Sequence, residues 1–221
     1  MSFFNTLKTQ TENHRLELFS APIMNKALTG DVVLEEYIHF LTQAYHHVKH
    51  TVPLLMAAGS KLPGTMEWLR SAVAEYIEEE LGHEEWVLND LEVCGVNKES
   101  IRLSQPTLPT ELMIAYAYDV INRINPIGFF GMVHVLEGTS IAVADQAADG
   151  IQKALSLPDT AFSYLRSHGA LDEDHVKFFE SLMNKIDDKE QQHCIIHCAQ
   201  VFYRLYGDIF RSIDSSQIFR Q

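Results

Sequence analysis

The chain has 221 residues, enough for one sizeable hydrophobic core or two small ones. Hydrophobic residues make up 46% and charged residues 21%, a composition typical of a soluble globular protein. The formal net charge of −13 argues against a nucleic-acid backbone or an anionic membrane as a partner, because either would repel the chain at short range.

The cysteines and the N-terminal stretch bear on the compartment. Cys94, Cys194 and Cys198 form neither a dense disulfide framework nor a CxxC pair, so a reducing, cytoplasmic setting is expected. The first stretch, MSFFNTLKTQTENH, lacks the basic region and long apolar run of a signal peptide. We expect no membrane-spanning segment.

The spacing of apolar residues favours helices, because strand alternation and Asn-Gly or Asp-Gly hairpin turns are missing. We expect a first helix over residues 3–25, broken near Pro22, with a stop at Gly30. A long second helix is expected over residues 32–58, kinked at Pro53. Two further helices are predicted over residues 66–94 and 112–125, and another opens at Pro126. A short helical segment follows Pro158. The last two helices are predicted over residues 164–185 and from Asp187-Asp188 onward.

Nothing in the sequence divides the chain into domains. A loop over residues 104–110, rich in Ser, Pro and Thr, is expected at the surface. Internal repeats, low-complexity tracts and long linkers are missing. We therefore predict an all-α fold, a single helical domain covering residues 1–221.

The predicted helix over residues 164–185 carries His168, Asp172 and His175. At about 100° per residue, offsets of +4 and +7 place these side chains within roughly 60° of one another. Two imidazoles and a carboxylate suit iron or manganese, although such residues also gather on solvated helix faces. This stripe is a candidate metal site that needs further ligands from other helices.

Two other places supply candidate ligands. Glu80 and His83 are spaced i,i+3, and Glu79 could replace Glu80 as the acid, but this spacing recurs elsewhere in the chain. Glu137 is more informative, because it lies in an apolar run where an unpaired carboxylate would cost several kcal/mol to bury. A metal, protonation or a basic partner would offset that cost. His134, one turn earlier, is either a rival ligand or a hydrogen-bonded core histidine.

The candidate ligands add up to three carboxylates and three imidazoles: Glu80, His83, Glu137, His168, Asp172 and His175. Two divalent ions carry four positive charges, of which the carboxylates cancel three, so such a pair could be buried nearly neutral. Carboxylates that bridge two irons leave open positions for O₂.

The order His168-x3-Asp172-x2-His175, preceded by Glu137 and by Glu80-x2-His83, resembles the ligand pattern of the haem-oxygenase-like di-iron oxidases and oxygenases. Their superfamily also holds TenA, PqqC and the haem oxygenases. The resemblance implies a bundle of seven to eight helices, two iron ions inside it, and O₂ activation that oxidises a small, partly apolar organic substrate. It also implies a homodimer.

Haem is the first alternative to two irons. Residues 7–47 resemble the N-terminal region of a haem oxygenase, whose proximal haem ligand is a histidine placed like His14. The run VHVLEG, which contains Glu137, resembles the distal helix of bacterial haem oxygenases. The next residues, 139–144, depart from that family, because it uses glycines there to let the backbone approach the haem.

A metal-free binding protein of the TenA or PqqC kind is the second alternative, because similarity of fold does not transfer function. Thiaminase activity of the TenA type is not expected, since it needs a cysteine on the helix that carries Glu137, and none lies between Cys94 and Cys194. For the di-iron hypothesis, Tyr45 is the expected redox or proton-transfer partner. We expect it to line a pocket together with Phe40, Phe129 and Met132.

Overall fold

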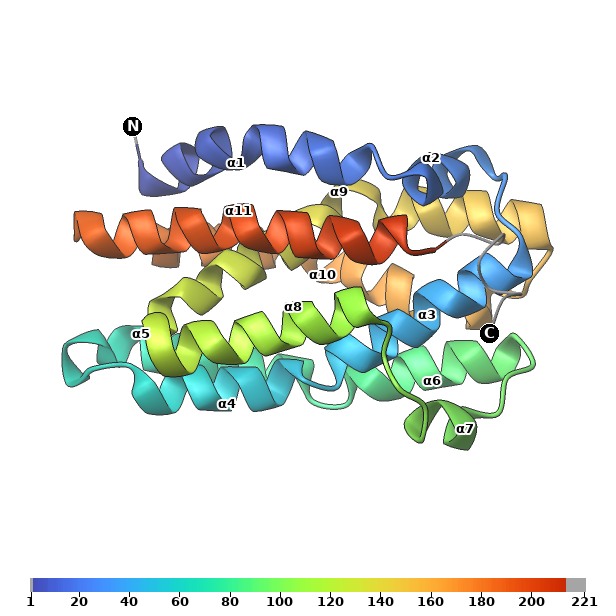
Figure 1. Ribbon diagram of the computed structural model, residues 1–221, viewed down its shortest axis with the longest axis horizontal. Coiled ribbons are helices and arrows are strands. Elements are labelled where there is room, and N and C mark those ends of the chain that lie inside the picture. Colours follow the sequence, from blue (N-terminus) through green and yellow to red (C-terminus); the bar gives the residue numbers. More distant parts are fainter. Residues whose placement is uncertain (1, 214–221) are drawn as a thin grey trace.

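The computed structural model describes residues 2–213, without the side chains of residues 168–174. Every regular element in this part of the chain is helical, which confirms the all-α prediction (Figure 1). The α-helices are α1 (Phe3–Phe19), α2 (Pro22–Thr29), α3 (Leu34–Val48), α4 (Thr51–Lys61), α5 (Glu67–Glu80), α6 (His83–Val93), α7 (Lys98–Arg102), α8 (Leu108–Asp119), α9 (Phe129–Leu155), α10 (Ser163–Met183) and α11 (Lys189–Arg211). Short 3-10 turns cover Gly64–Met66, Pro126–Gly128 and Asp159–Ala161, and a π turn covers Val120–Ile124.

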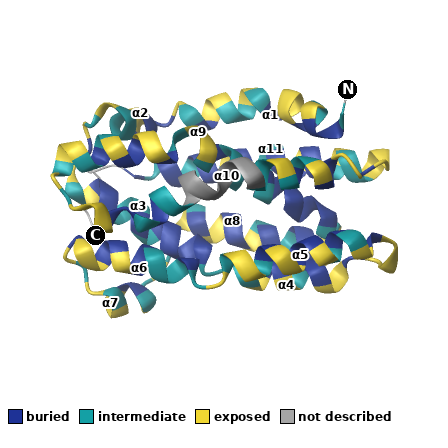
Figure 2. Cartoon of the chain, turned by 180° about the vertical axis from the view of Figure 1, so that it is seen from behind, coloured by how far each residue is buried: buried dark blue, intermediate teal, exposed yellow. Residues whose placement is uncertain are grey.

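Helix α9 runs through the bundle and packs against α10, α11 and α2. Helices α1 and α2 lie along one edge of the molecule, and α4, α5 and α6 lie along the opposite edge (Figure 1). Buried apolar side chains from all these layers form one continuous core, while exposed residues gather on the outer faces (Figure 2). The first turns of α9, which lead to Glu137, therefore lie within this core.

The length and composition of Pro126–Leu155 would allow it to cross a membrane, which the sequence expectation did not foresee. However, 61% of its most apolar 18-residue window is buried inside the bundle. A helix that is apolar nearly all round is typical of a protein core as well as of a membrane span. Its neighbours in the bundle account for its composition.

The long helix expected over residues 32–58 is broken, and the prediction of a kink at Pro53 was wrong. The chain turns earlier, at Lys49 and His50, where α3 ends and α4 begins. Pro53 falls in the first turn of α4, where a backbone N–H has no partner within the helix. Proline is therefore tolerated there without a kink.

The helix expected over residues 66–94 is also broken, at Leu81 and Gly82. Gly82 has a φ of 89°, in the left-handed region that favours glycine. Glu80 is consequently the last residue of α5, and His83 is the first residue of α6. The assumption that both lie on one continuous helix was wrong.

Other predicted boundaries are confirmed. Pro22 opens α2, and Gly30 ends it with a φ of 75°. The side chain of Asp188 accepts hydrogen bonds from the first turn of α11, as an N-cap does. One boundary differs from the prediction. The helix expected over residues 112–125 starts earlier, at Leu108, and becomes a π-helix after Asp119.

Candidate functional site

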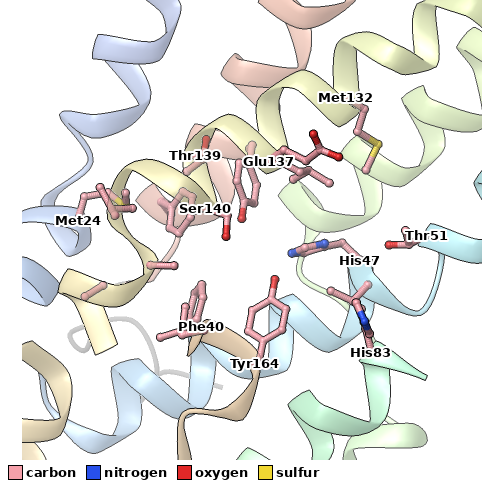
Figure 3. A pocket seen from close by; sticks show the side chains of 18 of the residues that line it. Met24, Phe40, His47, Thr51, His83, Met132, Glu137, Thr139, Ser140 and Tyr164 are labelled. Atoms are coloured by element: carbon pink, nitrogen blue, oxygen red, sulfur yellow. The ribbon is translucent and has the colours of Figure 1, made fainter. Parts of the chain in front are cut away.

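A cavity of about 160 Å³ lies alongside α9 and is lined mainly by apolar side chains. Its lining includes four of the six ligands predicted from the sequence, and these come from four helices: Glu80, His83, Glu137 and His175. Figure 3 shows Glu137 of α9 and His83 of α6 around the same space. The remaining two predicted ligands, His168 and Asp172, lie outside the described side chains of α10.

Glu80 and His83 meet across the break between α5 and α6. The His83 Nδ1 atom lies 3.1 Å from Oε2 of Glu80. The His83 ring stacks on Trp86, with ring centroids 3.9 Å apart and an interplanar angle of 25°. Only 4% of the His83 side chain is exposed, so the imidazole is held in one place at the cavity wall.

Glu79, the alternative first acid, reaches a different residue. Its Oε2 atom lies 3.2 Å from Nε2 of His175, on α10. Glu79 is 44% exposed, and it is not among the lining residues of the cavity, whereas Glu80 is. The geometry therefore favours Glu80 as the acid that faces the interior, with Glu79 holding the His175 ring from outside.

Tyr76 lines the cavity one turn before Glu80 and was missed by the sequence analysis. Burial raises the pKa of its hydroxyl well above the usual value, and the negative charge of the nearby Glu137 raises it further. Tyr76 therefore keeps its proton and can offer it to a neighbouring carboxylate. The i,i+4 spacing of Tyr76 and Glu80 is the one sequence signal that could have identified it.

His47, Tyr164 and Tyr206 are further polar residues at the cavity, and Figure 3 shows the first two. The rings of His47 and Tyr206 meet edge to face, with centroids 5.7 Å apart. Burial raises the pKa of Tyr164 well above its usual value, so this hydroxyl also stays protonated. Together with Tyr76 they supply hydrogen-bond donors to an otherwise apolar space.

Tyr45 does not line the cavity, whereas Phe40, Phe129 and Met132 do, as expected. The ammonium group of Lys49 lies 5.1 Å from the centre of the Tyr45 ring. The structure gives no support for Tyr45 as a partner of this site.

The histidines that flank His47 have structural partners. His46 Nε2 lies 2.9 Å from the Ser104 hydroxyl, and His50 Nδ1 lies 3.1 Å from the Tyr118 hydroxyl. Both contacts join α3 and the following turn to residues 104–118. Burial is the main cause that lowers the pKa of His46, to about 4. These two imidazoles hold helices together, and His47 is the one that reaches the cavity.

The donor set at the cavity suits iron in its chemistry. Carboxylates and imidazoles together favour iron or manganese over softer metals. Within the part of the chain whose side chains are described, however, no three His, Cys, Asp or Glu residues lie close enough together to hold an ion. The acids and imidazoles contact one another in pairs instead, Glu80 with His83 and Glu79 with His175.

A second cavity, of about 310 Å³, lies between α1, α9, α10 and α11, and Glu137 lines both cavities. His134 borders this outer cavity, and its Nε2 atom lies 3.3 Å from the Thr11 hydroxyl. His134 is thus a hydrogen-bonded core histidine, the second of the two roles expected from the sequence. His14, the ligand required by the haem alternative, lines neither cavity.

The profile of a family described as iron-containing redox enzymes matches residues 38–207. No curated protein matches the chain. A domain of unknown function from Shewanella denitrificans, with a haem-oxygenase-like fold, is 22% identical at a TM-score of 0.87, covering 100% of this chain and 96% of that one.

Two further structures extend the likeness of fold. A TenA homologue from Pseudomonas syringae pv. tomato is 9% identical at a TM-score of 0.82, covering 96% of this chain and 92% of its own. The haem oxygenase of Leptospira interrogans is 15% identical at a TM-score of 0.77, with 96% and 99% covered. At these identities the three structures show a shared fold, which confirms the bundle expected from the sequence.

Proposed function

Because the chain belongs to the family of iron-containing redox enzymes and has the haem-oxygenase-like fold, we propose that it is a non-haem di-iron oxidase or oxygenase. It would use O₂ to oxidise a small, partly apolar organic substrate. One observation carries the proposal: Glu80, His83 and Glu137, with His175, line one mainly apolar cavity although they come from four helices.

In this proposal the iron ligands are Glu80, His83, Glu137, His168, Asp172 and His175. Iron, when bound, would supply the reduction of O₂, which apolar side chains and ordinary acids or bases cannot perform. The protein supplies the ligands and a mainly apolar space around them.

The residues around the ligands fix them in place. Trp86 holds the His83 ring by stacking, and Glu79 contacts His175 from the outer side. Tyr76 keeps its proton beside Glu137, so it can donate to that carboxylate. These neighbours would orient ligands as the partners of metal-bound histidines and carboxylates do. Tyr76 is better placed than Tyr45 to deliver a proton to this site.

The substrate class follows from the lining. Met24, Leu28, Phe40, Phe129 and Met132 give the cavity its apolar walls. The few hydroxyl and imidazole groups lie at the same cavity as the acids. Sites of this kind bind a largely apolar molecule and use a few polar groups to orient it. A homodimer in the cytoplasm, acting on a small molecule and on neither nucleic acid nor membrane, completes the proposal.

Iron content tests it directly. Protein produced with added iron and kept from air should carry close to two irons per chain, measured by elemental analysis. Glu137→Gln and His175→Ala should each lower this to below about one, because each removes a ligand. Glu190→Gln and His193→Ala form the matched control, since they are the same substitutions at residues of α11 that line neither cavity. Far less than one iron per chain in the unaltered protein, or equal loss in the controls, would contradict the proposal.

A further inference from the structure

Two cysteines on α11, Cys194 and Cys198, lie one helical turn apart and line neither cavity. Both sulfur atoms converge on Gly128, at the turn that leads into α9. A Cβ atom on Gly128 would lie 2.8 Å from the Cys198 sulfur and 3.2 Å from the Cys194 sulfur. The two thiols therefore share the space that this glycine leaves open.

The two thiols have unequal surroundings. Cys198 is fully buried, and the Tyr116 hydroxyl donates to its sulfur at 3.8 Å. Cys194 is partly exposed. Interaction with the Cys198 thiol lowers the pKa of Cys194 to about 7, and the same interaction raises the pKa of Cys198. One thiol is thus accessible to reagents and the other, inside the core, supports it.

We propose that Cys194 is a modification site, a nucleophilic thiol that reacts with hydroperoxides and soft electrophiles while Cys198 donates a hydrogen bond to its sulfur. Exposure, a nearby donor and a second thiol within reach are what distinguish reactive cysteines from inert buried ones. The proposal does not depend on the iron site, because neither sulfur borders the cavity.

In the reaction with hydrogen peroxide, the Cys194 thiolate attacks one peroxide oxygen, so an S–O bond forms and the O–O bond breaks. The departing hydroxide takes up a proton from solvent and leaves as water. Sulfur loses two electrons, the peroxide gains them, and the product is a sulfenic acid at Cys194.

The third cysteine serves as an internal control. Cys94 is buried at 9% exposure, and burial is the main cause that raises the pKa of its thiol to about 11. It should therefore stay unreactive under conditions in which Cys194 reacts. A comparison within one folded protein removes differences in concentration, reagent and stability.

Alkylation by iodoacetamide, read at each cysteine by peptide mass spectrometry on the native full chain, tests the proposal. The rate at Cys194 should be half-maximal near pH 7. Cys198→Ala should move this midpoint toward the ordinary thiol value and slow the reaction at pH 7 by about threefold to fourfold, because the loss of thiolate is partly offset by its higher nucleophilicity. Cys198→Ser should restore most of the rate, because serine keeps a donor at nearly the same place.

Peroxide gives an independent readout that needs no variant. After exposure to hydrogen peroxide, Cys194 should carry a dimedone label or a disulfide to Cys198, and Cys94 should carry neither. The proposal is overturned if Cys194 reacts no faster than Cys94 with iodoacetamide or with hydrogen peroxide. This comparison needs only the unaltered protein, so it remains possible if Cys198→Ala fails to fold. It is also overturned if Cys198→Ala folds and leaves the pH midpoint at Cys194 unchanged.

Discussion

The buried carboxylate of Asp90 accepts a hydrogen bond of 2.9 Å from the backbone N–H of Tyr164, at the first turn of α10. Its other oxygen accepts from the backbone N–H of Ser163 at 3.0 Å and from the Ser163 hydroxyl. Residue Phe162, at the N-cap position, makes no such bond. A residue of α6 therefore caps the helix that carries His175.

Replacing Asp90 by alanine should lower the free energy of unfolding by about 2–4 kcal/mol, since a cap is lost and buried N–H groups lose their acceptor. Urea denaturation followed by circular dichroism measures this difference. Asp188→Ala is the matched control, because Asp188 caps α11 at an exposed position. It should cost about 1 kcal/mol. An equal loss in both variants would argue against a special role for Asp90.

Gly82 separates Glu80 from His83, and its φ of 89° makes it the second position to test. A Cβ there would meet no atom within 4 Å, so the cost of Gly82→Ala is backbone strain alone, about 1–2 kcal/mol. The iron content should also fall, because the two proposed ligands are joined through this residue. Gly64→Ala provides the comparison, since its Cβ would also meet open space and its φ is not positive. A neutral Gly82→Ala would show that the break between α5 and α6 does not require glycine.

Two glycines of α9 should respond in opposite directions to the same substitution. A Cβ on Gly131 would lie 2.6 Å from the backbone nitrogen of Ala199 and 2.8 Å from the carbonyl oxygen of Ile195. Gly131→Ala should therefore force α9 and α11 apart and destabilise the fold by about 3 kcal/mol or more. On Gly138 the nearest atom would be the Tyr203 hydroxyl at 3.9 Å, so Gly138→Ala should be neutral or stabilising by about 0.5–1 kcal/mol. Thermal unfolding of both variants decides this.

The helical fold could be predicted from the sequence, because apolar spacing reports directly which face of a helix is buried. The break at Gly82 could not be predicted, because the flanking residues keep a helical pattern on both sides and only the backbone angles of Leu81 and Gly82 differ. The turn at His50 was missed for a similar reason. The kink was predicted at Pro53 because proline breaks a helix interior, but Pro53 lies in the first turn of α4, where proline causes no kink.

Within the site, the candidate iron ligands were easier to predict than their neighbours. Tyr76 and His47 look like ordinary core or surface residues in the sequence, and only the packing of α3, α5 and α9 brings them to one cavity. Tyr45 was chosen because it lies beside the histidines of α3. Each residue turns a helix by about 100°, so Tyr45 and His47, two positions apart, point about 160° away from each other.

The haem alternative predicts a different cofactor response. Because His14 lines neither cavity, we expect that haemin added to the purified protein gives no Soret band dependent on this residue. Absorbance titrations of the unaltered protein and of His14→Ala should coincide. A strong band that His14→Ala abolishes would favour haem over two irons.

His134 should make the stability of the protein depend on pH. Burial is the main cause that lowers its pKa from 6.5 to about 4 in the folded chain, whereas the unfolded chain takes up a proton near pH 6.5. Between these values the unfolded state binds more protons, so the free energy of unfolding falls as the pH falls. The contribution is complete above about pH 6.5 and amounts to about 3 kcal/mol, which is lost by about pH 4.

Exchange of His134 for phenylalanine should reduce this slope, because no proton can then be taken up at that position. The ring would still pack against Phe4 and Phe179, and the Thr11 hydroxyl would keep its bond to the carbonyl oxygen of Leu7. Urea denaturation between pH 4.5 and 7.5 gives the slope for each protein. His193→Phe, at an exposed position of α11, should leave it unchanged. If His134→Phe has the same slope as the unaltered protein, other groups cause the acid sensitivity.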